Sequence, residues 1–177
     1  MRRRYAEALA ERRKLSSEVF ALLGGAHTGE LVAPDCAQIE EAELREVLCA
    51  LDADRLECLE LQHCGRGLSD SVAATFASTY AAHGGLPLLH TVRLGGAYRM
   101  SDDGVASLLS AAPRLRTLAL NAVCRLTGHG VDTICAGVGE SLTSLDLSHS
   151  NQLKDADVRG GLIDGLPALE RLNLAGL

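Results

Sequence analysis

The residues best suited to chemistry in this sequence are an aspartate, a serine and a histidine within four positions, Asp146, Ser148 and His149. Such side chains activate a serine nucleophile when the histidine contacts both the serine and the aspartate. In a strand, however, Asp146 and Ser148 point to the same side about 7 Å apart, and His149 points to the other. Because nothing in the segment supplies an oxyanion site, we expect no enzymatic activity.

The cysteine and histidine residues around Cys58, His63 and Cys64 could suggest a metal site. The two-residue cysteine spacing of structural zinc sites does not occur in the sequence. Cys36 and Cys64 instead hold equivalent positions in a repeated pattern, which fits small packed side chains. The glycines of LGGAYRM and LTGHGVD lack the downstream lysine of a phosphate-binding loop. We therefore expect neither a metal nor a cofactor.

The elements that carry these residues come from a repeated apolar pattern, which is most regular at residues 115–137. Leucines there alternate at strand spacing and then recur at helix spacing, as in a leucine-rich repeat. The middle strand position recurs at Leu31, Leu59, Val92, Leu118, Leu145 and Leu172. We predict an α/β leucine-rich-repeat solenoid, or horseshoe, with a parallel β-sheet on its concave face and helices on its convex face.

The same pattern divides the chain into two parts. Residues 1–25 place apolar side chains at helical intervals before two glycines, which predicts an N-terminal capping helix. Residues 26–177 form an array of about six repeats, in which Ser69, Ser101 and Thr127 are expected to cap helices with their hydroxyls. The last repeat is incomplete, since its strand has no helix after it. We expect a fragment, or a chain that another protein continues.

The distribution of charge restricts the partners of the chain. Residues 1–24 carry six Lys/Arg and three Glu, whereas residues 25–177 carry 11 Lys/Arg and 20 Asp/Glu, a net charge of −9. Such an acidic body matches a phosphate backbone poorly, so direct nucleic-acid binding is not expected. Polar residues interrupt each apolar stretch before it could span a membrane. We expect a nuclear or cytoplasmic protein whose six cysteines are reduced.

Side chains that alternate with the buried leucines face the concave surface, which repeat proteins use for binding. Tyr98 and Met100, in the loops beside that surface, offer apolar anchors for a partner. We predict a partner-binding surface made of Glu60, Gln62, Arg93, Tyr98, Met100, Asn121, Asp146, Ser148, Arg171 and Asn173. The alternative is that these positions are merely solvated, because curvature creates the face whether or not a partner uses it.

Several segments resemble known repeat families. The LxxLxLxxC segment ending at Cys64, followed by GLSD and later MSDDGV, resembles the cysteine-containing class of leucine-rich repeat found in the arms of F-box ubiquitin ligases. The resemblance covers residues 31–177, with Ala97, Val123 and Ser150 in place of the cysteine. LELQHCGRGLSD, residues 86–121, LTSLDLSHSNQL and LERLNLAGL more closely resemble the leucine-rich-repeat subunit of the global-genome nucleotide-excision-repair factor and its plant-type relatives.

This resemblance implies a non-catalytic protein–protein interaction scaffold in DNA repair. It also implies a helicase-like ATPase as one partner and, through an elongin-type adaptor, a cullin ubiquitin ligase as another. Two alternatives remain open: a structural repeat subunit of a large assembly, and a substrate receptor of an F-box-type ligase with no role in repair. The sequence does not choose between them, and it leaves the oligomeric state open.

Overall fold

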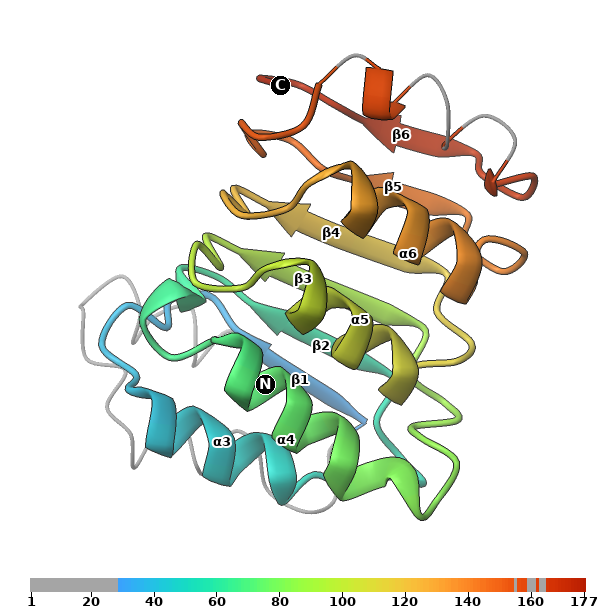
Figure 1. Ribbon diagram of the computed structural model, residues 1–177. Coiled ribbons are helices and arrows are strands. Elements are labelled where there is room, and N and C mark those ends of the chain that lie inside the picture. Colours follow the sequence, from blue (N-terminus) through green and yellow to red (C-terminus); the bar gives the residue numbers. More distant parts are fainter. Residues whose placement is uncertain (1–28, 155, 159–161, 163–164) are drawn as a thin grey trace.

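The computed structural model describes residues 29–154, 156–158, 162 and 165–177. Its six strands form one parallel sheet in the order of the sequence (Figure 1). The strands are β1 (Glu30–Ala33), β2 (Cys58–Leu61), β3 (Thr91–Gly95), β4 (Thr117–Asn121), β5 (Ser144–Asp146) and β6 (Arg171–Asn173). The predicted α/β class and the six parallel strands are confirmed. The expected capping helix at residues 1–25 lies outside the described residues.

Helices alternate with the strands and cover one face of the sheet (Figure 1). They are α3 (Glu41–Cys49), α4 (Asp70–Ala81), α5 (Asp102–Ala111) and α6 (Gly128–Val138), and a short 3₁₀ helix, η1 (Cys64–Arg66), follows β2. Each packs beside the next, α3 on α4, α4 on α5 and α5 on α6. A crossover of this kind is what parallel pairing requires, because neighbouring strands run in the same direction. A further helix is expected near Val158, and most of it lies outside the described residues.

The strand register follows the repeated pattern residue by residue. Leu31 pairs with Leu59, Leu59 with Val92, and Leu118 with both Val92 and Leu145. These side chains are at most 1% exposed, and burying each one fully contributes about 1.5–3 kcal/mol. Their counterpart Leu172 is 46% exposed. An edge position alone does not cause this exposure, because β1 lies at the other edge of the described sheet and its Leu31 is buried. The two edge strands differ in that α3 follows β1, whereas β6 is the last described element.

Two of the three predicted hydroxyl caps are confirmed. Ser69 Oγ and Thr127 Oγ1 accept hydrogen bonds from N–H groups in the first turns of α4 and α6, at 3.4 and 3.3 Å. The prediction for Ser101 is wrong, because α5 has no side-chain cap. The Ser101 hydroxyl donates to the Asp70 carboxylate of the preceding helix at 2.8 Å. That contact alone does not prevent capping, since the Thr127 hydroxyl donates to Asp102 in the same way and still accepts from the His129 N–H.

One backbone position just after each of the last five strands has left-handed angles, with φ between 54° and 75°. It is held by His63, Gly96, Ala122, His149 and Gly176. Glycine takes these angles without strain, whereas an alanine or histidine there costs about 1–2 kcal/mol. The turn therefore recurs whatever residue occupies it, which indicates that the stacking of the units imposes it.

Candidate protein-binding site

The face of the sheet away from the helices carries a pair of opposite charges at neighbouring positions. Glu60 in β2 and Arg93 in β3 are paired in the strand register, and Arg93 Nη1 lies 3.5 Å from Glu60 Oε2. The Arg93 side chain is 45% exposed and the Glu60 side chain 16% exposed, so the guanidinium group is the more accessible of the two charges.

Gln62 lies just after the end of β2, beside the same neighbouring strand. A Cβ added at Gly95 would collide with the Gln62 side-chain amide, so the amide lies directly over this glycine. The absence of a side chain at Gly95 thus positions Gln62, which the structure places beside Glu60 and Arg93 as predicted.

A second polar group surrounds Asp146, at the end of β5. Its carboxylate accepts from Asn173 Nδ2 at 3.0 Å and from the N–H of Ser148 at 2.9 Å. Partial burial raises the pKa of Asp146, but the hydrogen bonds from Ser148, Asn121 and Asn173 outweigh that effect and hold the pKa below its usual value. Asp146 therefore stays anionic at neutral pH.

Ser148 does not belong to the exposed surface, contrary to the sequence prediction. The side chain is only 4% exposed, and its Oγ accepts a hydrogen bond from Asn121 Nδ2 at 2.8 Å. The reason is that β5 ends at Asp146, so Ser148 lies in the turn that follows the strand. Arg171 stays exposed at the sheet edge, where its Nε donates to Ser144 Oγ at 3.4 Å.

The structure exposes one of the two predicted loop residues, Tyr98, and buries the other, Met100. Tyr98 is 53% exposed, whereas Met100 is 0% exposed and belongs to the core. Met100 follows two residues after Tyr98 and takes the buried position that closes the turn before α5. Tyr98 is therefore accessible to a partner, and its role as a contact stays a prediction. Met100 is buried, so the prediction that it contacts a partner is wrong.

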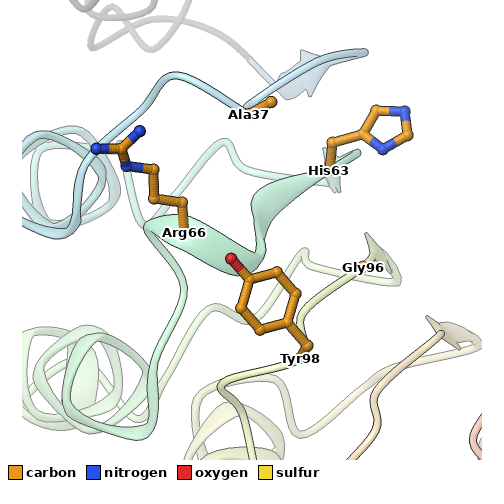
Figure 2. Close-up of a pocket in the computed structure, with 5 residues that line it drawn as sticks. All are labelled: Ala37, His63, Arg66, Gly96 and Tyr98. Atoms are coloured by element: carbon orange, nitrogen blue, oxygen red, sulfur yellow. The ribbon is translucent and has the colours of Figure 1, made fainter.

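The Tyr98 ring rests on the backbone of η1. A Cβ added at Gly65 would collide with this ring and with the carbonyl oxygen of Gly96, so only glycine at position 65 allows the close approach. Figure 2 shows Tyr98 reaching from its loop toward η1 and Arg66. A half-exposed aromatic ring mounted on rigid backbone is a suitable anchor for a protein partner, because little conformational entropy is lost on binding.

Two hollows flank Tyr98. One, of about 450 Å³, is lined by Ala37, His63, Arg66, Gly96 and Tyr98 (Figure 2). The other, of about 330 Å³, is lined by Glu41, Ser69, Asp70, Ser71, Tyr98, Arg99 and Arg125. Both are open depressions at the ends of the strands. Each is wide enough for one or two side chains of a partner rather than for an enclosed small molecule.

A row of three arginines, Arg66, Arg99 and Arg125, runs along this rim, one from each of three consecutive units. Arg99 Nη1 donates to the Arg66 carbonyl at 2.9 Å, and Arg125 Nη1 donates to the Arg99 carbonyl at 3.1 Å. The row is absent from the sequence prediction. The sequence does contain a pattern that indicates the row, because each arginine stands one or two residues before the apolar anchor of its turn. The anchors are unevenly spaced, so the arginines do not recur at a constant interval.

Each arginine of the row also faces a carboxylate. Arg66 pairs with Glu40, Arg99 with Glu41 at 3.1 Å, and Arg125 with Asp70 at 3.9 Å. The guanidinium groups of Arg99 and Arg125 are thus each held by acceptors from two chain segments, and that of Arg66 by Glu40. The rim is a pre-ordered polar surface with Tyr98 at its centre.

Metal-ligand groups, membrane-spanning helices and disulfides are not found among the described residues. No group of three or more His, Cys, Asp or Glu among them could hold a metal ion. None of the described helices is long and apolar enough to cross a membrane. All six cysteines are free, with Cys36 and Cys64 buried.

Comparison with known proteins gives a similarity in structure and none in sequence. No family model matches the chain, and no curated protein matches it. A solved structure described as "Crystal structure of Rad7 and Elc1 complex in yeast" is similar, with 17% sequence identity and a TM-score of 0.49. The match covers 96% of this chain and 55% of the other, so this chain spans about half the length of the matched one.

Proposed function

We propose that the chain is a leucine-rich-repeat solenoid that works as a non-catalytic scaffold for protein recognition. The observation that carries this proposal is Tyr98, half exposed, packed on Gly65 and flanked by two hollows. The recurrence of strand, turn and helix in register supports the repeat class, because each unit buries its leucines only against its neighbours.

Recognition combines an anchor with a charge pattern. The Tyr98 ring offers apolar area that a partner can cover, and such rings supply much of the energy in protein interfaces. Glu60, Arg93 and Asp146 present fixed charges on the adjoining strand face, and charges of this kind select partners more than they add affinity. The surface is suited to a folded protein that spans the rim and the strand face together.

We further propose a role in DNA repair linked to ubiquitin ligation, in the nucleus or the cytoplasm. The support is the resemblance of LELQHCGRGLSD, residues 86–121 and the two later strands to the repair-factor subunit. The partners that follow from it are a helicase-like ATPase and an elongin-type adaptor of a cullin ligase. The acidic body of the chain favours contact with DNA through such a partner rather than directly.

The test is a calorimetric titration of the chain with a purified elongin-type adaptor and, separately, with a purified helicase-like repair ATPase. Tyr98→Ala is expected to raise the Kd of the bound partner about tenfold or more, since a buried aromatic anchor contributes over 1 kcal/mol. Leu88→Ala is the matched control, because Leu88 is 44% exposed and precedes the strand that Tyr98 follows. If neither protein binds, the repair role is wrong. If a partner binds and both variants weaken it equally, Tyr98 is not the anchor.

A further inference from the structure

We propose that the hollow between η1 and Tyr98 receives an acidic side chain of the partner, with an apolar neighbour of that side chain packed on the Tyr98 ring. This inference rests on the proposed function and names the chemistry that the rim selects. It concerns the hollow of about 450 Å³ lined by Ala37, His63, Arg66, Gly96 and Tyr98.

The first argument is the charge of the lining. Arg66 is the arginine that lines this hollow, and no carboxylate is among the lining residues. The hollow opens on a body that carries 11 Lys/Arg against 20 Asp/Glu over residues 25–177. An exposed guanidinium group in a largely acidic surface attracts a carboxylate and repels a basic side chain.

The second argument is the availability of Arg66. Its side chain is 54% exposed and its partner Glu40 is 53% exposed. An exposed ion pair of this kind adds little stability, so a ligand carboxylate can take the place of Glu40 at low cost. A guanidinium group can hold a carboxylate through two parallel N–H···O hydrogen bonds, which gives geometric selection as well as attraction.

The third argument is that the hollow is pre-ordered. Arg99 Nη1 holds the Arg66 carbonyl at 2.9 Å, and the Gly65 backbone supports the Tyr98 ring. The Tyr98 wall and the backbone that carries Arg66 are therefore placed before a partner arrives, which reduces the entropy lost on binding. The ring forms the apolar wall beside the guanidinium, so the preferred ligand has an aromatic or aliphatic residue next to its acid.

The hollow on the other side of Tyr98 lacks this preference. Its lining contains the carboxylates of Glu41 and Asp70 as well as the guanidinium groups of Arg99 and Arg125. Each of these arginines already faces one of those carboxylates. Arg66 faces a carboxylate too, but its partner Glu40 is not among the residues that line its hollow. The two hollows therefore differ in whether the lining itself presents carboxylates to an incoming acidic group.

The test uses nuclear magnetic resonance titration of the ¹⁵N-labelled chain with two capped tetrapeptides, FDEF and its isosteric amide counterpart FNQF. FDEF is expected to shift the amide signals of Arg66, Gly96 and Tyr98 and to bind about tenfold or more tightly than FNQF. Arg66→Gln should remove that preference. Arg114→Gln is the matched control, because Arg114 is exposed before β4, at the opposite ends of the strands, and it should keep the preference. Retained signal dispersion shows that each variant is folded.

A gain-of-function variant makes the same test sharper. Glu40→Gln frees Arg66 and keeps a side-chain oxygen at the start of α3, so it should tighten FDEF binding several-fold and leave FNQF binding unchanged. Equal binding of the two peptides at Tyr98 would overturn the acidic preference while leaving protein recognition intact. An absence of saturable shifts at these three residues would overturn the hollow as a binding site, whereas the adaptor and ATPase titrations judge the proposed function separately.

Discussion

The carboxylate of Asp70 accepts two hydrogen bonds from Ser101, one from its N–H at 2.7 Å and one from its hydroxyl at 2.8 Å. The next unit repeats the arrangement, because Asp102 accepts from the N–H and hydroxyl of Thr127 at 2.9 and 2.6 Å. Each aspartate is the first residue of one helix, and its partner stands just before the first residue of the next. The starts of α4, α5 and α6 are thereby joined in sequence beneath the rim that carries Tyr98.

Asp102→Ala should lower the free energy of unfolding by about 1–3 kcal/mol, because it removes two charge-assisted hydrogen bonds from a partly buried site. Urea unfolding followed by circular dichroism measures the change. The adjacent Asp103→Ala is the control: its side chain is exposed, and it should lose only about 0.5 kcal/mol of helix-dipole interaction. Equal losses for the two variants would show that the link between α5 and α6 is unimportant.

Exchanging alanine and glycine at two equivalent left-handed turn positions should change the stability of the protein in opposite directions. Ala122→Gly, at φ 56°, should stabilise the protein by about 0.5 kcal/mol, since relief of backbone strain exceeds the added conformational freedom of the unfolded chain. Gly96→Ala, at φ 70°, should destabilise by about 1–2 kcal/mol. A Cβ at Gly96 meets only ordinary contacts, the nearest being His63 Cα at 3.7 Å. Thermal melts that move both variants in the same direction would contradict the assignment.

Leu118→Ala should cost about 2–5 kcal/mol, because Leu118 is 0% exposed at the centre of the sheet and the substitution leaves a cavity. Leu88→Ala, at an exposed leucine, should change the melting temperature little. A melting curve that Leu118→Ala leaves unmoved would refute the strand register.

Asp146 gives a dependence of stability on pH. Because its pKa in the folded chain lies below the unfolded value, its stabilising contribution is fully present above an unfolded pKa of about 3.9 and is lost as the pH falls through the folded pKa. The destabilisation caused by Asp146→Asn should therefore be larger at about pH 6 than at about pH 3. Urea unfolding of both proteins at the two pH values measures this difference, and a constant difference would show that the carboxylate is not held by Ser148 and Asn173.

Thiol reactivity should distinguish buried from half-buried cysteines. Burial raises the pKa of Cys64 to about 12, and burial together with the neighbouring Cys64 and Asp35 raises the pKa of Cys36 further. At about pH 8 both stay protonated, so iodoacetamide should label them at least about tenfold more slowly than half-buried Cys124. Mass spectrometry of timed samples resolves the order, and labelling in urea should equalise the rates. Early modification of Cys64 in the folded chain would contradict its burial.

The sequence by itself determined the units and their register. A strand can bury a stripe of leucines only by alternation, and a helix can bury one only at intervals of three and four, so the order of apolar residues fixes which side of each element faces the core. For this reason the positions from Leu31 to Leu145 were predictable, as were the buried Cys36 and Cys64. The pattern also identified the strand-face residues Glu60, Arg93 and Asp146.

Only the tertiary structure decided what happens where one unit meets the next. Tyr98 and Met100 are both apolar loop residues two positions apart, and the packing of the turn buries one while Gly65 holds the other at the surface. The Ser101 hydroxyl donates to Asp70 of the preceding helix, a contact between two units that the sequence of neither unit predicts. Alternation acts within an element, whereas these contacts join residues about 30 positions apart, through loops whose paths depend on how neighbouring units stack.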